Sequence, residues 1–359
     1  MALTLYITAT EPFSGKTAFC VGLLRRFQRD GYTVGYMKPV GTRARVVGGR
    51  VIDKDAHFIK YSLGLPDSLD QMAPIQLDAT QLRAALTGAS PDFTAKLQAA
   101  FAAVSAGKEI MVLEGAGHFR EGRVLGLAPG AVAKLLQSRQ LVVVPYDNDL
   151  QATDDLLVIK RWLGDSLVGG VINQVPPERR EAVVNRIKPF VERQGVPLFA
   201  VLPQVETLKF VSVIGLSREL DGQILCAHHV VDTLVEHVMV GAMDSARAFD
   251  YFRRTPNKAV ITSGDRIDLQ LSALETSTRC LILTNNIQPS PMILDRAETA
   301  NIPIILTAHD TFNVIELAER YLGRHRFHRE ENVQRFDSLL SEFMDFDGLY
   351  RTLELSPVI

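Results

Sequence analysis

The chain has 359 residues, of which 47% are hydrophobic and 22% charged, and its formal net charge is −2. This balance is typical of a packed protein long enough for two domains, and it gives no support to electrostatic binding of nucleic acid or of an anionic membrane. Three scattered cysteines favour a reducing compartment. No apolar run reaches the ~18 residues of a membrane helix. We therefore expect a cytoplasmic protein.

Six continuous apolar runs of strand length divide the first 205 residues, with helix-length segments between them. They are Leu3–Thr8, Thr33–Met37, Ile110–Leu113, Leu141–Pro145, Leu167–Ile172 and Leu198–Leu202. Continuous apolar runs indicate strands covered on both faces, and their alternation with helices indicates a mostly parallel sheet. Ligands bind beyond the carboxyl ends of such strands, so we expect functional residues directly after each run.

The turn after the first run has the sequence Ala9-Thr10-Glu11-Pro12-Phe13-Ser14-Gly15-Lys16-Thr17 and precedes a helix-like segment. Strand, tight loop and helix form the context of a phosphate-binding P-loop, in which backbone N–H groups point at an anion. We predict that a nucleotide is bound by Ser14, Gly15, Lys16 and Thr17, with the Thr17 hydroxyl suited to Mg²⁺. Thr10 stands where this pattern usually has its first glycine. The alternative is a polar turn with a solvated lysine.

Polar residues also follow three later runs. Lys38 precedes a proline that ends its strand. Glu114 ends the third run before a stretch of small residues, which is a Walker-B-like placement. Asn173 could present its amide to a purine edge. The structural alternatives are a surface lysine, a turn or capping carboxylate, and a common strand-end asparagine.

A basic, glycine-containing stretch, Arg43–Arg50, is expected to be a mobile loop that could act as a lid. Asp53 and Asp55 come directly after it. Either carboxylate could hold Mg²⁺ through an oxygen or a water, or both could simply be solvated.

A second set of shorter apolar runs predicts a smaller α/β unit. They are His237–Val240, Ala259–Thr262, Cys280–Thr284 and Ile302–Thr307. The polar residues at the ends of these runs could be helix caps or ligand residues: Asp265, Arg266, Thr284 and Asp310. Arg266 is a poor cap and suits an oxyanion.

The remaining segment, 324–359, carries apolar residues at helical spacing, among them Phe336 and Leu340. We expect a helix packed on the surface of this chain or of a partner. The predicted architecture is therefore α/β: a mostly parallel P-loop sheet domain, a smaller α/β domain and a short helical tail.

Residues 1–205 resemble the dethiobiotin synthetase fold, a member of the P-loop families. The matching pieces are Thr8–Thr17, Tyr36–Val40, the region of Asp53 and Asp55, Val112–Gly117 and Ile172–Val175. The resemblance implies that Thr17, Asp55 and Glu114 hold Mg²⁺, and that ATP is the nucleotide. It further implies that Lys16 and Lys38 are catalytic residues holding phosphate or a carboxylate substrate, and that Asn173 lies at the purine.

Residues 206–323 resemble the DRTGG domain through Gly241–Met243, Gly264–Arg266, Leu281–Thr284 and Asp310–Thr311. Asn285-Asn286 replaces the glycine pair of that pattern. The two domains in this order resemble the N-terminal regulatory half of long bacterial phosphotransacetylases. The chain stops without the acetyltransferase domain, so the resemblance does not imply acetyl transfer.

Two functions fit these observations. In the first, the chain is a regulatory protein that binds ATP and Mg²⁺, senses a small anionic metabolite or nucleotide through the DRTGG domain, and forms a homo-oligomer. In the second, it is an ATP-dependent ligase that activates a carboxylate or carbamate by phosphorylation, as dethiobiotin synthetase does.

Overall fold

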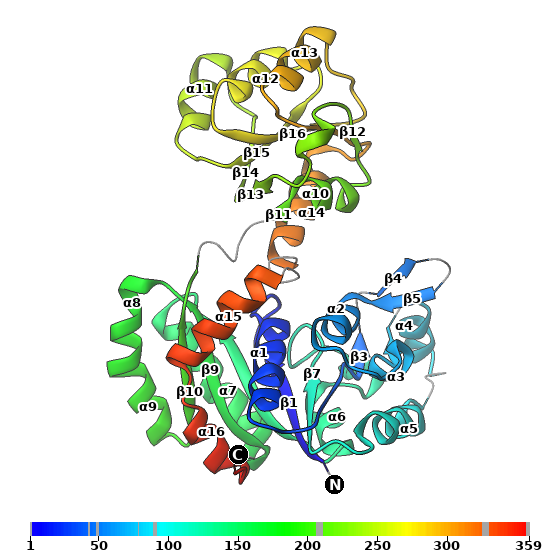
Figure 1. Cartoon of the computed structure of the whole chain (residues 1–359), viewed down its shortest axis with the longest axis vertical. Helices are drawn as coiled ribbons and strands as arrows, with labels where there is room; N and C mark the ends of the chain where they lie inside the picture. The colour runs from blue at the N-terminus through cyan, green and yellow to red at the C-terminus, as the bar shows by residue number, and fades with distance from the viewer. Residues whose placement is uncertain are drawn as a thin grey trace. The chain divides into compact units, whose positions relative to one another are not determined.

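The chain divides into two compact units. A computed structural model describes residues 2–41, 44–47, 50–77, 79–88, 92–205, 211–324 and 330–356. One unit combines residues Met1–Gln204 with His328–Ile359, and the other consists of residues Val205–Phe327 (Figure 1). The second unit is therefore inserted in the chain between two parts of the first.

A six-stranded parallel sheet forms the centre of the first unit, in the order β10-β9-β8-β1-β7-β2. Its strands are β1 (Leu3–Ala9), β2 (Val34–Met37), β7 (Ile110–Glu114), β8 (Arg139–Pro145), β9 (Leu167–Val175) and β10 (Leu198–Pro203). All six apolar runs are thus strands, and most of their residues are buried. The predicted parallel α/β fold is confirmed, because burial on both faces requires continuous apolar sequence.

Helices connect the strands of this sheet. They are α1 (Lys16–Arg29), α2 (Lys54–Leu63), α3 (Leu69–Met72), α4 (Ala79–Leu86), α5 (Thr94–Ser105), α6 (Pro129–Leu135), α7 (Asp149–Leu163), α8 (Pro177–Ala182) and α9 (Lys188–Arg193). A π-helical turn, Val183–Ile187, separates α8 from α9. Helix α7 and the segment from α8 to α9 bury Leu156, Val183 and Val191 in one core with β8 and β9.

Two small ribbons complete the first unit. Strand β3 (Val40–Gly41) pairs with β6 (Ile75–Gln76), and β4 (Ala44–Val47) pairs antiparallel with β5 (Arg50–Asp53). The described residues of Arg43–Arg50, where the sequence indicated a mobile loop, therefore lie in two strands that pair with each other, and the mobility of this stretch stays a prediction. Residues 43, 48 and 49 of that stretch lie outside the described residues.

The second unit contains a five-stranded sheet in the order β12-β17-β16-β15-β14. Its elements are β11 (Val211–Ser212), α10 (Val213–Glu219), β12 (Gln223–Ile224), β13 (Leu234–Val235), β14 (His237–Val240), α11 (Ser245–Arg253), β15 (Lys258–Ser263), α12 (Ile267–Leu274), β16 (Thr278–Thr284), α13 (Pro291–Thr299), β17 (Ile304–Leu306) and α14 (Thr311–Arg324). Strands β14 to β17 are mutually parallel, and only β12 runs antiparallel at the edge. The four predicted runs form these four strands, each buried between two apolar clusters.

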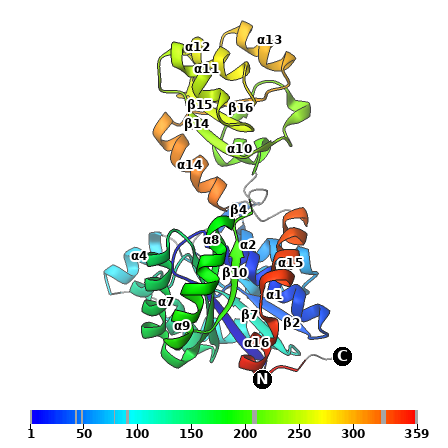
Figure 2. The same ribbon diagram turned by 90° about the vertical axis from the view of Figure 1, so that its left-hand side faces the viewer.

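The C-terminal segment packs on the first unit of the same chain. Helix α15 (Glu330–Phe343) lies beside α1, and α16 (Phe346–Leu353) follows it (Figures 1 and 2). Leu340 is 2% exposed, and a Cβ added to Gly22 of α1 would lie 2.2 Å from its Cδ1. Glycine at this position therefore allows the two helices to approach closely.

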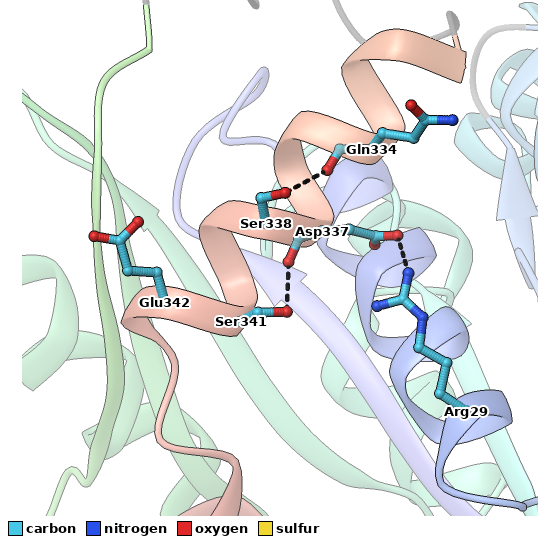
Figure 3. A pocket seen from close by; sticks show the side chains of 6 residues that line it. All are labelled: Arg29, Gln334, Asp337, Ser338, Ser341 and Glu342. Atoms are coloured by element: carbon cyan, nitrogen blue, oxygen red, sulfur yellow. Dashed lines mark hydrogen bonds and ion pairs between the residues drawn. The ribbon is translucent and has the colours of Figure 1, made fainter.

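Charged side chains reinforce this contact along one edge. Asp337 is buried and accepts from Arg29 at 2.7 Å and from Arg25 at 3.1 Å. Figure 3 shows the Arg29–Asp337 pair beside an open hollow of about 580 Å³ that is lined by Arg29, Gln334, Asp337, Ser338, Ser341 and Glu342. The residues that line this hollow are polar, so it marks the rim of the helix contact.

Among the described helices, none is both long and apolar enough to cross a membrane.

We predict that Leu340→Ala destabilises the first unit by about 2–5 kcal/mol, because it removes a buried side chain and leaves a cavity over Gly22. Glu342→Ala on the exposed side of the same helix serves as the matched control. Urea unfolding of both variants measures the difference. Equal stability of the two variants would show that α15 does not contribute to the core.

Lys258 at the start of β15 is a buried cation in the second unit. Its side chain is fully buried, and Nζ donates to Thr276 Oγ1 at 2.9 Å. Burial lowers the pKa of Lys258 to about 8, since removing the ammonium from water disfavours its charged form.

The lowered pKa predicts a specific pH dependence of stability. Between pH 8 and about 10 the unfolded chain binds a proton at Lys258 that the folded chain has released, so stability should rise with pH, by up to roughly 1.4 kcal/mol per unit. Below pH 8 both forms are protonated and this contribution to the slope disappears. Lys258→Met should flatten the rise, as measured by urea unfolding from pH 7 to 10.5. Identical slopes for the two proteins would contradict the prediction.

Candidate functional site

The carboxyl edge of the first sheet brings together residues from three adjacent strands. Strand β7 lies between β1 and β2, so the loop after β1, the end of β7 and the residue after β2 share one edge. Lys16, Glu114 and Lys38 come from these three positions, and all three are buried. The structure therefore brings these three side chains to one edge of the sheet, and their role in a site stays a prediction.

The loop after β1 is held in a turn that leads directly into α1. Gly15 has φ +91°, a left-handed conformation that glycine adopts without steric cost. The next residue, Lys16, donates through Nζ to the carbonyl oxygen of Gly117 in the loop after β7. Burial lowers the pKa of Lys16 to about 8, although the nearby Glu114 opposes this shift. The Ser14 hydroxyl is buried and has no hydrogen-bond partner among the described residues, so it could donate to a phosphate oxygen.

Glu114 is the central carboxylate of this edge. Thr17 donates through Oγ1 to Oε1 at 2.7 Å, and the buried Tyr36 hydroxyl donates to Oε2 at 2.8 Å. Burial and the charge of Asp55 raise the pKa of Glu114 to about 7, and Lys38 and the two hydrogen bonds act in the opposite direction. Tyr36 was not predicted as a site residue, because it lies inside a continuous apolar strand; its signal in the sequence was its place in the family-matching piece Tyr36–Val40.

Lys38 forms ion pairs with Asp53, the last residue of β5, and with Asp55 in the first turn of α2. Its Nζ lies 3.4 Å from Asp53 and contacts Asp55 as well. Burial alone would lower the pKa of Lys38, but the surrounding carboxylates raise it well above its usual value. Asp53 also caps α2 by accepting from the N–H groups of Asp55 and Ala56, both at 3.0 Å.

The residues at this edge fit a Mg²⁺ ion. The Thr17 hydroxyl and the carboxylates of Glu114 and Asp55 are oxygen donors of the kind that Mg²⁺ prefers. In the described part of the chain, no three His, Cys, Asp or Glu side chains gather into a metal cluster.

Asn173 lies against the P-loop. It lies within β9, two residues before the end of the strand, and donates through Nδ2 to the Ser14 carbonyl oxygen at 2.9 Å. The following residue, Gln174, donates through Nε2 to the Phe13 carbonyl oxygen at 3.3 Å. Gln174 was missed in the sequence, where its only signal is its place beside Asn173 at a strand end. A role for Asn173 at a purine stays a prediction.

The four candidate residues of the second unit also lie at one sheet edge, because they follow the parallel strands β15, β16 and β17. Asp265 is exposed. Arg266 forms two bonds of 3.1 Å with Asp268 and donates to the Met243 carbonyl at 2.9 Å. Asp310 caps α14 by accepting from the Asn313 N–H at 2.8 Å.

Thr284 is fully buried at the end of β16, and its hydroxyl lies 3.1 Å from that of Thr311. The next residues, Asn285 and Asn286, have φ +60° and +54°. Asparagine enters this left-handed region more readily than other residues with a side chain. The pair can therefore keep the backbone shape that glycines would give, while adding side chains at the edge.

The fold and the two edges define a P-loop α/β protein joined to a second small α/β domain. Residues 3–212 match the AAA domain family and residues 215–321 match the DRTGG domain. The first match covers more than half of the 359 residues, and the chain belongs to this AAA domain family. The resemblance to a dethiobiotin synthetase-like P-loop domain followed by a DRTGG domain is confirmed.

Named relatives show the same two-part likeness. The phosphate acetyltransferase of Nitratidesulfovibrio vulgaris is 26% identical over 97% of this chain and 51% of its own length. The ATP-dependent dethiobiotin synthetase of Aromatoleum aromaticum is 27% identical over 56% of this chain and 90% of its own length. The chain therefore spans about half the length of the phosphate acetyltransferases it matches.

Among solved structures, the chain is similar to the CBS and DRTGG domains of a Clostridium perfringens pyrophosphatase complexed with its activator, diadenosine tetraphosphate. The two are 23% identical, with a TM-score of 0.28, over 32% of this chain and 48% of the other.

Proposed function

We propose that this chain is a regulatory protein that binds ATP with Mg²⁺ in the first unit and a nucleotide or small anionic metabolite in the DRTGG unit. The observation that carries the proposal is the contact between the Thr17 hydroxyl and the buried Glu114 carboxylate, next to the Lys16 ammonium. A P-loop hydroxyl, a strand-end carboxylate and a lysine are the groups that Mg²⁺-nucleotide binding requires.

Each group has a distinct part in this proposal. Lys16 and the loop N–H groups would bind the β- and γ-phosphates, and Thr17, Glu114 and Asp55 would hold the metal. Bound Mg²⁺ would neutralise phosphate charge. Lys38 would face the terminal phosphate when Asp55 turns from it to the metal, because its ion pairs already place its charge at this edge.

The path of the chain supports coupling between the two units. The DRTGG unit is connected to the first unit at both ends, since α15 and α16 belong to the first unit. Helix α15 packs on α1, the helix that begins at Lys16. A ligand-dependent shift in the DRTGG unit could therefore reach the P-loop helix through its covalent connection to α15. We propose that this link, in a homo-oligomer, reports the ligand state to a partner.

The binding part of the proposal predicts two different losses. Lys16→Ala should weaken ATP binding at least tenfold with or without Mg²⁺, because it removes a charge that contacts phosphate. Glu114→Gln should mainly remove the gain in ATP affinity that Mg²⁺ provides. Isothermal titration with ATP, with and without Mg²⁺, measures both, and the exposed Lys134→Ala is the matched control. Unchanged ATP affinity in a folded Lys16→Ala variant would refute nucleotide binding by the P-loop.

The regulatory part predicts that a DRTGG ligand changes ATP affinity. Titrations of ATP with and without inorganic phosphate, acetyl phosphate or AMP should reveal a shift of roughly fivefold or more for one of them. Arg266→Ala should abolish that shift and leave the basal ATP affinity unchanged. Arg253→Ala, on the surface of α11, is the control and should change neither the shift nor the basal ATP affinity.

Equal ATP affinities under all these conditions would contradict the coupling. ADP release above background with small carboxylic acids would instead favour the ATP-dependent ligase.

A further inference from the structure

We propose that Asp53 is a positioning residue that keeps the Lys38 ammonium at the sheet edge when Asp55 turns from it to the metal. This inference rests on the proposed binding of ATP with Mg²⁺ by the first unit. From the spacing of the residues alone, either aspartate could hold Mg²⁺. Their surroundings in the structure differ, and this difference gives them separate parts.

The two carboxylates differ first in their exposure. The side chain of Asp53 is 1% exposed, whereas that of Asp55 is 26% exposed. Mg²⁺ gives up its water reluctantly and usually keeps several water molecules in its shell. A carboxylate that binds such an ion must therefore be open to solvent. Of the two aspartates, Asp55 meets this requirement and Asp53 does not.

Asp53 uses its two oxygens for two different partners. Oδ1 accepts from the N–H groups of Asp55 and Ala56, both at 3.0 Å, and so caps α2. Oδ2 lies 3.4 Å from the Lys38 Nζ. A Cβ added to Gly41 of β3 would lie 2.8 Å from the same oxygen, so glycine there leaves room for the carboxylate. One side chain thus ties the first turn of α2 to the lysine after β2.

Lys38 needs a counterion that stays in place. Its backbone N–H donates to the Met72 carbonyl at 2.7 Å, and its side chain is only 8% exposed. A buried ammonium that loses its partner charge is strongly unfavourable. The nearby Glu114 already accepts hydrogen bonds from two hydroxyl groups. Asp53 is therefore the carboxylate that remains with Lys38 once Asp55 has left.

The anchor has a consequence for metal binding. Movement of Asp55 to the metal separates it from Lys38, with which it forms an ion pair. While Asp53 is charged, the ammonium keeps one carboxylate partner throughout. Without that charge, Lys38 would rely on Asp55 alone and would compete with the metal for it. Loss of the charge should therefore reduce the benefit of Mg²⁺ to ATP binding.

The experiment separates the charge of Asp53 from its capping bonds. Asp53→Asn keeps an oxygen that can cap α2 and removes the charge, whereas Asp53→Ala removes both. ATP is titrated calorimetrically into the full chain and these variants, with and without Mg²⁺. Both variants should reduce the gain in ATP affinity that Mg²⁺ provides by roughly fivefold or more. Asp345, which caps α16 by accepting from the Gly348 N–H at 2.8 Å, supplies the matched control, and Asp345→Asn should leave the gain unchanged.

A second comparison tests whether Asp53 acts through Lys38. In a Lys38→Met background, Asp53→Asn should cause no further loss of the Mg²⁺ gain, because the side chain that it positions is absent. A loss of equal size with and without Lys38 would overturn the proposal, since Asp53 would then act by its own charge. If Asp53→Asn does not fold, Asp53→Ala takes its place in this comparison.

Other outcomes would also decide against the anchor. A full Mg²⁺ gain in Asp53→Asn, with a loss in Asp53→Ala alone, would make Asp53 a helix cap and nothing more. Thermal unfolding identifies variants that do not fold, and if Lys38→Met is among them, this contrast between the two Asp53 variants decides. A wild-type chain without any Mg²⁺ gain would refute the proposed function itself. A wild-type gain that both Asp53 variants retain would overturn the present inference alone.

Discussion

The hydrogen bond between Thr17 and Glu114 joins the first turn of α1 to the end of β7, and the geometry of the candidate site depends on it. A carboxylate that is 2% exposed is costly to keep charged without partners. Two hydroxyl groups donate hydrogen bonds to this carboxylate. Lys38 lowers the pKa of Glu114, and Glu114 in turn raises the pKa of Lys16. The edge thus holds buried ionisable groups of both signs close together, and a bound cation and phosphate would complement them.

The polar residues of the two sheet edges differ in whether their partners come from distant strands or from nearby positions in the sequence. At the first edge, charged groups from separate strands face one another within a buried site. At the second, Arg266 pairs with Asp268 two residues away and Asp310 caps the helix that follows it. Such local bonds can be exchanged for bonds to a ligand at modest cost. On the proposed function, the second unit would therefore exchange these local bonds for bonds to its ligand.

The contact of α15 with α1 joins the segment that follows the inserted unit in the chain to the helix that begins at Lys16. Asp337 is held by two arginines of α1, and Leu340 packs over Gly22 in the middle of that helix. Packed helices shift between discrete arrangements and do not deform smoothly. Displacement of α15 would therefore reach the helix whose first residue is Lys16, about two turns from this packing contact.

The sequence by itself determined the strands, the P-loop and the strand-end positions of Lys38, Glu114 and Arg266, because apolar periodicity and turn chemistry act over a few neighbouring residues. Only the tertiary structure decided that α15 packs on α1, that Tyr36 reaches Glu114, and that the Asn173 amide binds the Ser14 carbonyl across 159 residues of chain. No local pattern encodes these contacts, since they depend on which strands the sheet makes neighbours. The physical reason is that a side chain's partner is set by the packing of distant segments, whereas its secondary structure is set largely nearby.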